Sequence, residues 1–323
     1  MLYEIFKEKR CFKLICGAGN EDVNEVEKLV ALYSKAGCNF FDVCAKKEVI
    51  EAAKRGLAKA GITKDRYLCI SVGAESDQHF CKAQINEETC IQCGQCHSAC
   101  QQGAIDMVDK KYSVNKIRCI GCKRCIDNCP TNSIQLIQHK TDLKEILPPL
   151  VNLGLDCIEF HVLGDEGKDE LLTRWNEIMQ NFDGPLSISI NRSVLGDKDL
   201  IKCVRDLVEV RKPFTTIIQA DGIPMSGGKD SYKSTLQAVA IADVFKGSDL
   251  PVYIMVSGGT NSKTAELAKQ CEVDIEGIAI GSYARKIVKD YVSQDDFFEN
   301  KQTFENALKI AKNLVDVSLN NLK

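Results

Sequence analysis

The sequence lacks an excess of positive charge, a long apolar segment and the apolar core of a secretory signal. Its 42 Lys and Arg are offset by 45 Asp and Glu, which gives a formal net charge of −3, whereas nucleic-acid-binding proteins usually carry a basic surface. No uninterrupted apolar run approaches the ~20 residues of a membrane-spanning helix. The first residues are interrupted by charges, unlike a signal peptide. We therefore expect a cytoplasmic protein with no nucleic-acid partner and no membrane span.

Cysteine, by contrast, is abundant, with 17 in a chain of 323 residues. Structural disulfides are rare in a reducing cytosol, so clustered cysteines there point to metal binding. Eight of them form two runs with the spacing C-x2-C-x2-C-x3-C, and the second run ends in Cys129-Pro130. This pattern is typical of bacterial ferredoxins that hold two [4Fe–4S] clusters.

In such ferredoxins, the fourth cysteine of each run ligates the cluster of the other run. The predicted ligands are therefore Cys90, Cys93, Cys96 and Cys129 for one cluster, and Cys119, Cys122, Cys125 and Cys100 for the other. Two zinc sites are the alternative, because pairs of C-x2-C motifs also bind zinc. Eight thiolates in two complete runs favour the clusters. One departure from the ferredoxin pattern is Gln101, which follows Cys100 where many ferredoxins have proline.

The rest of the chain alternates short apolar or β-branched segments with segments of helical periodicity. The expected strands are Phe12–Gly17, Phe40–Ala45, Tyr67–Val72, Cys157–Leu163, Leu186–Ile190, Thr215–Ala220, Val252–Val256 and Gly277–Gly281. The expected helices are Glu21–Lys35, Lys47–Lys59, Leu143–Leu153, Lys168–Asn181, Lys198–Arg211, Ser231–Phe245, Lys263–Cys271 and Gln302–Leu319. Eight strands alternating with helices predict a closed (β/α)8, TIM-like barrel; an open doubly wound sheet is the alternative.

The cysteine runs fall between the third expected strand and its helix. We expect a discontinuous barrel of residues 1–73 and 141–323, with residues 74–140 forming an inserted bacterial-type 2[4Fe–4S] ferredoxin-like domain. Without the insertion, the chain has about 250 residues, which is typical of this barrel. Loops that follow strands form the C-terminal face of such barrels, where ligands bind. The clusters would therefore lie near the barrel mouth.

Two loops near the end of the chain suggest a phosphate site, because barrels commonly bind phosphate after their last two strands. Glycine backbone, hydroxyl groups and an arginine are suitable anion partners. A flavin mononucleotide (FMN) or another phosphate-bearing ligand would satisfy these loops, while tight turns and helix caps are the alternative explanation. The residues of this predicted site are Ser257, Gly258, Gly259, Thr260, Gly281, Ser282 and Arg285.

Further polar groups are expected at strand ends around the mouth. Asp42, His161 and Asp221 are candidate acid–base groups, although each is equally suited to a structural role. Cys16 and Cys44 end neighbouring strands and are candidate redox-sensitive thiols. The glycine-rich segment 221–228 has the composition of a mobile or tightly turned lid.

Several of these segments together resemble the light-dependent period (LdpA) family of cyanobacteria. The resemblance rests on residues 12–18, the doubled ferredoxin run, residues 257–261 and residues 281–285. It implies an iron–sulfur protein that senses cellular redox state and relays it to the circadian clock, with redox partners and clock proteins as its associates. The alternatives are an FMN-dependent oxidoreductase whose ferredoxin module passes electrons to a substrate in the barrel mouth, and an electron carrier with a structural barrel.

Overall fold

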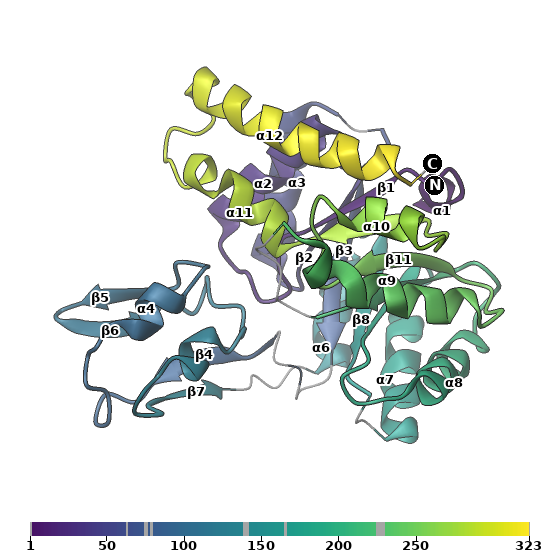
Figure 1. Ribbon diagram of the computed structural model, residues 1–323, viewed down its shortest axis with the longest axis horizontal. Coiled ribbons are helices and arrows are strands. Elements are labelled where there is room, and N and C mark those ends of the chain that lie inside the picture. The colour runs from purple at the N-terminus through teal and green to yellow at the C-terminus, as the bar shows by residue number, and fades with distance from the viewer. Residues whose placement is uncertain are drawn as a thin grey trace.

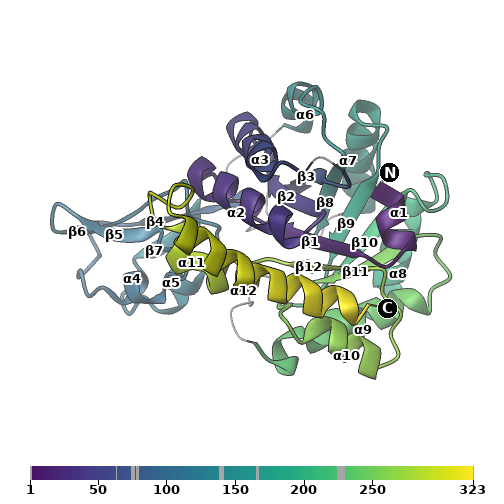
Figure 2. The same ribbon diagram turned by 90° about the horizontal axis from the view of Figure 1, so that it is seen from above.

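Eight parallel strands close into a barrel in the computed structural model, which describes residues 2–62, 64–73, 77, 80–137, 142–164, 167–223 and 230–322. Around the barrel the strand order is β1-β12-β11-β10-β9-β8-β3-β2 (Figures 1 and 2). The predicted (β/α)8 barrel is confirmed. The strands are β1 (Cys11–Ile15), β2 (Phe40–Cys44), β3 (Tyr67–Gly73), β8 (Cys157–Val162), β9 (Leu186–Ile190), β10 (Thr216–Asp221), β11 (Tyr253–Ser257) and β12 (Gly277–Ile280).

Helices cover the outside of the barrel, as Figure 2 shows. They are α2 (Val23–Ala36), α3 (Lys47–Ala60), α6 (Leu143–Val151), α7 (Lys168–Asn181), α8 (Asp197–Val208), α9 (Tyr232–Lys246), α10 (Thr264–Gln270), α11 (Ser282–Val292) and α12 (Lys301–Asn320). The sequence did not predict α11, which begins where the second expected phosphate loop was placed. None of the helices in the described ranges is both long and apolar enough to cross a membrane.

The barrel interior changes from apolar to polar along its axis. A short helix, α1 (Leu2–Lys7), closes the N-terminal end, where Ile5 and Phe6 are fully buried with Phe40 of β2. Above this layer, the inward-facing positions of the strands carry polar side chains, including the fully buried Lys13 and Glu159. The polar part of the barrel interior therefore lies beyond the apolar layer that α1 closes.

The insertion between β3 and β8 forms a small module outside the barrel, on the left in Figure 1. Its elements are β4 (Lys82–Ile85), α4 (Gln95–Ala99), β5 (Ile105–Val108), β6 (Lys111–Val114), α5 (Arg124–Asp127) and β7 (Ile134–Ile137). Antiparallel pairing joins β4 to β7 and β5 to β6. Each half thus contributes one strand to each sheet, together with a short helix that contains one of the cysteines. The expected domain boundaries at 73/74 and 140/141 adjoin segments outside the described residues.

Candidate functional site

The eight cysteines of the two runs line two separate cavities in the module. The first, which we call the distal thiol cavity, is lined by Cys90, Cys93, Cys96 and Cys129. The second, the proximal thiol cavity, is lined by Cys100, Cys119, Cys122 and Cys125. The fold therefore brings the fourth cysteine of each run to the first three of the other, the arrangement that the ferredoxin pattern predicts. Within the described ranges, no three His, Cys, Asp or Glu side chains converge closely enough for a single metal ion.

Backbone groups of the module hold these sulfurs. The amide of Ala104 donates to Cys100 Sγ at 3.2 Å, and the amide of Ser133 donates to Cys129 Sγ at 3.3 Å. A third amide, from Ala83, donates to Cys119 Sγ at 3.3 Å. Such N–H···S hydrogen bonds are among the features that set the reduction potential of an iron–sulfur cluster.

The loop of the distal thiol cavity requires a glycine. Gly94 has a φ of 77°, and a Cβ placed there would lie 2.6 Å from the hydroxyl oxygen of Tyr112. On the proximal side, burial raises the pKa of the Cys125 thiol to about 12. Ligation by a metal centre deprotonates a thiol outright. The four thiols around each cavity are therefore suited to a multi-iron group, which would stabilise them as thiolates.

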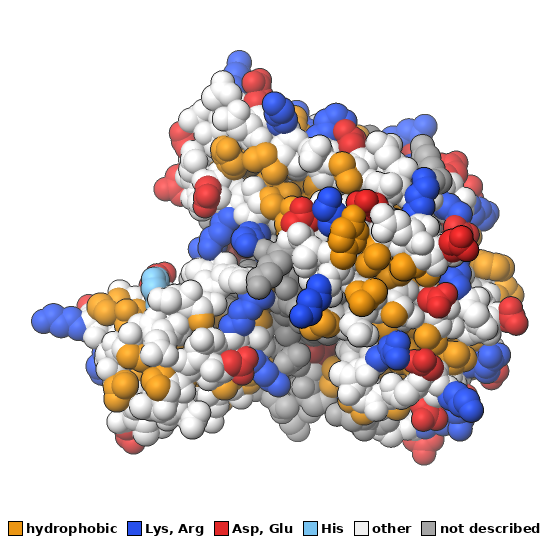
Figure 3. All heavy atoms as spheres, viewed as in Figure 1, with side chains coloured by type: hydrophobic (Ala, Val, Ile, Leu, Met, Phe, Trp, Pro, Cys, Tyr) orange, Lys and Arg blue, Asp and Glu red, His pale blue; other side chains and the backbone are white. Residues whose placement is uncertain are grey.

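The proximal thiol cavity faces the barrel. The Lys82 ammonium donates to the carbonyl of Cys119 at 2.9 Å and to that of Gly19, in the loop after β1, at 2.6 Å. On the other side, Arg285 Nη1 of α11 donates to Gln102 Oε1 at 2.7 Å, and Lys289 Nζ donates to the Gln101 carbonyl at 3.1 Å. Figure 3 shows lysine and arginine side chains gathered at the notch between the module and the barrel.

A cavity of about 80 Å³, the barrel cavity, opens at the C-terminal end of the strands. Its lining includes all seven residues that the sequence predicted to bind a phosphate and the three predicted acid–base residues. Ile120, which lies between Cys119 and Gly121 of the module, forms part of its wall. The lining residues are Ile15, Gly17, Ala18, Gly19, Asp42, Ile120, Glu159, His161, Ser189, Gln219, Asp221, Ser257, Gly258, Gly259, Thr260, Gly281, Ser282 and Arg285.

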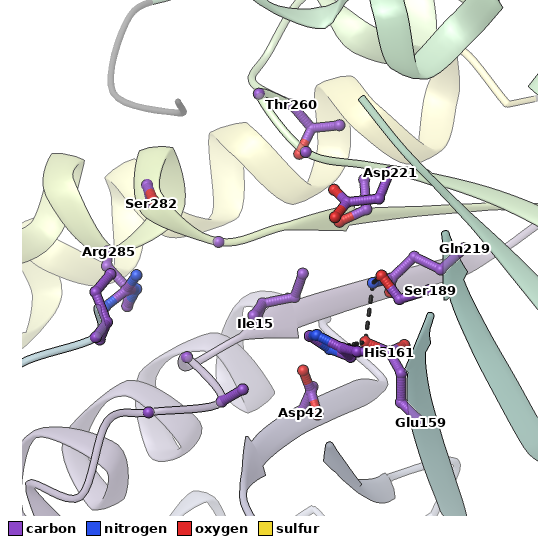
Figure 4. Close-up of a pocket in the computed structure, with 18 residues that line it drawn as sticks. Ile15, Asp42, Glu159, His161, Ser189, Gln219, Asp221, Thr260, Ser282 and Arg285 are labelled. Atoms are coloured by element: carbon purple, nitrogen blue, oxygen red, sulfur yellow. Dashed lines mark hydrogen bonds and ion pairs between the residues drawn. The ribbon is translucent and has the colours of Figure 1, made fainter. Parts of the chain in front are cut away.

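The two ends of the barrel cavity differ in charge (Figure 4). One end is formed by Ser282 and Arg285 at the start of α11, together with glycines of three loops. Arg285 is 7% exposed, and its Nε atom has no hydrogen-bond partner among the described residues. The hydroxyl of Thr260, which the sequence predicted to donate to a phosphate, instead donates to the Ala279 carbonyl at 2.6 Å.

The other end is a buried ionic network that sequence reasoning found only in part. Lys13 pairs with Glu159, and Gln219 connects the two by accepting from Lys13 Nζ at 3.0 Å and donating to Glu159 Oε1 at 2.9 Å. Burial disfavours the charged forms of both side chains, but the attraction between the two charges outweighs the cost of burial. The pKa of Lys13 is raised, and Lys13 and His161 together lower that of Glu159. The signal that sequence reasoning missed was the presence of a lysine and a glutamate within two otherwise apolar strands.

The predicted acid–base residues Asp42 and His161 belong to this network. Burial raises the pKa of Asp42 to about 6, despite the nearby Lys13, and Ser71 donates a hydrogen bond to its carboxylate at 2.8 Å. His161 Nδ1 lies 3.0 Å from Asp77 Oδ2, and its Nε2 lies 3.3 Å from Glu159 Oε1. Burial opposes protonation of His161, but the two carboxylates outweigh it and raise its pKa well above the usual value.

Cys16 and Cys44 are not the reactive thiols that their strand-end positions suggested. Cys16 is fully buried, and Cys44 is 7% exposed. Burial raises the pKa of Cys16 well above its usual value and that of Cys44 to about 12. A reactive cysteine needs exposure and a lowered pKa, so this prediction is wrong. The proposed lid falls largely on residues 224–228, which lie outside the described residues.

A larger cavity of about 440 Å³, the junction cavity, lies between the barrel and the module. Apolar side chains such as Val72, Phe80 and Leu143 line it, with Lys46 and Lys82 among its polar groups. Ala18 and Gly19 line both this cavity and the barrel cavity. The loop after β1, which Lys82 holds through Gly19, therefore stands between the two cavities.

Together, the barrel and the two thiol-lined cavities define an iron–sulfur protein built on a (β/α)8 barrel. A model of the 4Fe-4S dicluster domain matches residues 83–136, and a model of the Light dependent period A C-terminal domain matches residues 150–317. A relative, Light dependent period A from Synechococcus elongatus, is 31% identical over 313 residues, covering 85% of this chain and 80% of the relative. The chain belongs to the light dependent period A family.

Solved structures that resemble the chain include two with low sequence identity. One is described as a fructose-1,6-biphosphate aldolase from Coccidioides immitis (TM-score 0.54, 8% identity, covering 99% of this chain and 95% of that chain). The other is the tryptophan synthase alpha chain from Legionella pneumophila (TM-score 0.50, 7% identity, covering 98% and 96%). At this identity, the similarity shows the barrel fold alone.

Proposed function

We propose that this protein is a redox-responsive regulator that holds two [4Fe–4S] clusters and relays their state through its barrel to clock proteins. The observation that carries the proposal is the grouping of eight thiols around two cavities, one of which adjoins the barrel mouth. Cys90, Cys93, Cys96 and Cys129 would hold the distal cluster. Cys100, Cys119, Cys122 and Cys125 would hold the proximal one. When bound, each cluster supplies a one-electron couple.

The exposure of the cysteines supports different roles for the two proposed sites. Cys93 of the distal thiol cavity is exposed, so an external electron donor or acceptor can approach this side of the module. Cys119 and Cys125 of the proximal thiol cavity are buried, and Ile120 between them reaches the barrel cavity. We infer that the distal side exchanges electrons with a partner and that the proximal side is the one whose charge the barrel detects.

The contacts of Arg285, Lys289 and Lys82 with the module give this detection a physical basis. All three side chains are cations that donate to groups of the cysteine-bearing segments. A change of one negative charge in the proximal thiol cavity alters the energy of these contacts, because charges at a partly buried junction are only weakly screened. The relay to the clock is supported by family membership, since the Synechococcus relative is named for a light-dependent period.

The competing function is a flavin-dependent oxidoreductase, and the junction cavity is the observation that favours it. Its volume of about 440 Å³ lies within the range of small-molecule sites, and Lys82 connects its wall to Cys119. The barrel cavity is less suitable for a flavin ring, because its 80 Å³ is below the ~150 Å³ cavity that holds benzene.

Anaerobic purification with iron, sulfide and flavin quantification tests both functions. We expect about eight irons per chain and no flavin, with Cys90→Ser and Cys119→Ser each losing about four irons. Cys271→Ser, at an exposed cysteine outside the runs, is the matched control and should keep all of them. Full iron content in either cluster variant would refute the ligand assignment. Stoichiometric flavin would favour the oxidoreductase.

The relay itself is tested by pull-down from extracts under oxidising and reducing conditions, with the Cys119→Ser variant as a comparison. The partners recovered with the wild-type protein should change with redox state, and the variant should lose this change. Identical partner sets under both conditions would exclude redox-dependent signalling through these contacts.

A further inference from the structure

We propose that the junction cavity binds a small amphipathic anion, with a carboxylate group near Lys116 and an apolar body of about ten carbon atoms against the barrel wall and α6. This ligand is not the flavin of the competing function. Its binding requires no cluster, because none of the eight cysteines of the two runs is among the described residues that line this cavity. Its chemistry follows from how the charged and apolar groups of the lining are separated and from which of them already have partners.

The charged residues of the lining are gathered on one side. Glu21 pairs with Lys46 Nζ at 2.6 Å and with Lys82 Nζ at 2.9 Å. Its backbone amide donates to the carbonyl of Ile117 at 2.8 Å, which places the neighbouring Lys116 beside the same group. Among the described residues that line the cavity, three lysines stand against the one carboxylate of Glu21. The excess of positive charge on this side favours an anion.

Partners already occupy most of the polar groups of the lining. The Lys82 ammonium uses its three hydrogen atoms on the carboxylate of Glu21 and on two backbone carbonyls. The Ser71 hydroxyl donates to Asp42 at 2.8 Å. Lys116, by contrast, is exposed and has no hydrogen-bond or ion-pair partner among the described residues. A carboxylate that enters the cavity can therefore pair with Lys116 without breaking an existing contact.

The rest of the wall is apolar. Val72 of β3 and Leu143 of α6 are each 3% exposed, and they line the cavity together with Phe80. A flavin ring would leave its nitrogen and oxygen atoms without partners against this wall, whereas a hydrocarbon gains by leaving water. Because Lys46 and Lys116 are exposed, the charged side faces solvent and the buried apolar side chains lie deeper. A molecule with one charged end and one hydrocarbon end matches this arrangement.

The volume of the junction cavity sets the size of the apolar body. About 440 Å³ is roughly three times the ~150 Å³ cavity that holds benzene. A chain of about ten carbon atoms fits in this space, whereas a chain of about three would fill little of it. Decanoate is therefore the probe that we would use.

The test is isothermal titration calorimetry with decanoate, below its critical micelle concentration, on the full-length protein purified anaerobically with its iron content measured. We expect a single saturable site whose affinity rises about threefold for each methylene added from hexanoate to decanoate, because each methylene is buried in turn. Decyltrimethylammonium, which has the same chain and the opposite charge, should bind about tenfold more weakly than decanoate, because the lysines repel it.

Two variants change the two sides of the site separately. Lys116→Glu reverses the charge of an exposed side chain without partners, so it should fold and weaken decanoate binding about tenfold. Lys110→Glu, at an exposed lysine between β5 and β6 that does not line the cavity, is the matched control and should leave decanoate binding unchanged. Ala45→Phe places a ring in the cavity and should remove the dependence of affinity on chain length.

The proposal is overturned if decanoate does not bind, or if decyltrimethylammonium binds as tightly as decanoate. It is also overturned if Lys116→Glu or a folded Ala45→Phe binds decanoate as wild type does, or if FMN binds in competition with decanoate and more tightly. Because iron and sulfide are measured on the same samples, loss of the clusters would be distinguished from loss of this site.

Discussion

The guanidinium of Arg285 donates to the side chain of Gln102 at 2.7 Å and thereby joins α11 of the barrel to the segment that follows Cys100. Gln102 is preceded by Gln101, the residue at which the sequence departs from the common ferredoxin pattern. Gln101 is itself bonded to α11 through Lys289. The departure therefore falls where the module meets the barrel. Arg285 also lines the barrel cavity, so one side chain lies between this cavity and the segment that follows Cys100.

This contact predicts that a barrel side chain influences reduction of the module. A positive charge near a cluster stabilises its reduced, more negative state, so Arg285→Gln should lower one of two midpoint potentials by on the order of tens of millivolts. A redox titration monitored by electron paramagnetic resonance measures the shift.

Lys309→Gln is the matched control, because it removes one positive charge from an exposed position on α12. Equal shifts in Arg285→Gln and Lys309→Gln would mean that net charge alone is responsible. Unchanged midpoint potentials in Arg285→Gln would contradict the predicted influence of this arginine on the cluster.

The contact between His161 and Asp77 predicts a loss of stability as pH rises. The folded state raises the pKa of His161, so the stability that its protonation provides is fully present below the unfolded value of about 6.5 and is lost as pH rises toward the folded pKa. We expect the free energy of unfolding to fall by about 1 kcal/mol per pH unit between pH ~6.5 and ~8. This pH range lies below the ordinary pKa of cysteine thiols, so their titration does not contribute to the slope. Urea unfolding followed by fluorescence of the single tryptophan, the buried Trp175, measures it.

His161→Gln should remove this slope, and Asp77→Asn should reduce it, because Glu159 remains beside the imidazole. Both variants should also lower stability at pH 6, where the wild-type pair is intact. An unchanged slope in His161→Gln would assign the pH dependence to another group.

Much of the barrel was predictable because its strands are short apolar segments separated by helices of clear periodicity. All eight strands lie within about two residues of their expected bounds, as for β9 at Leu186–Ile190. α11 was missed because the residues from Gly281 to Arg285 were interpreted as a loop. A glycine such as Gly281 occurs in loops and also at the N-cap of a helix, so it does not distinguish the two. The cysteine grouping was predictable from the ferredoxin spacing, because in that pattern the fourth cysteine of each run joins the first three of the other.

The ionic network was only partly predictable. Lys13 and Glu159 are 146 residues apart in sequence and lie on β1 and β8, which are not adjacent in the barrel. Their pairing depends on which side chains point inward, and that depends on the closure and register of the barrel. Asp77 was equally hidden, because it lies between β3 and the module, where the sequence has no periodic apolar pattern that predicts a partner.

The burial of Cys16 and Cys44 predicts that neither reacts in the native protein. Treatment of the anaerobic protein with iodoacetamide should modify Cys271, which is exposed, and leave these two unmodified until urea is added. The pKa of both thiols is raised by burial, so even a transient opening would present a poor nucleophile. Peptide mass spectrometry measures the modification. Labelling of Cys16 or Cys44 at the rate of Cys271 would restore the redox-thiol hypothesis.

The turn after β11 predicts a large loss of stability from a single added methyl group. Gly258 has a φ of 70°, and a Cβ there would lie 2.6 Å from the amide nitrogen of Gly222, which is fixed by its hydrogen bond to the Ser257 carbonyl. Gly61 has a similar φ of 68° but no atom within 4 Å of the added Cβ, so Gly61→Ala isolates the conformational cost of about 1 kcal/mol. We expect Gly258→Ala to cost at least about 2 kcal/mol more, because backbone cannot move aside as a flexible side chain can. If urea unfolding shows the same loss of stability for Gly258→Ala and Gly61→Ala, the turn after β11 must shift to accommodate the added methyl group.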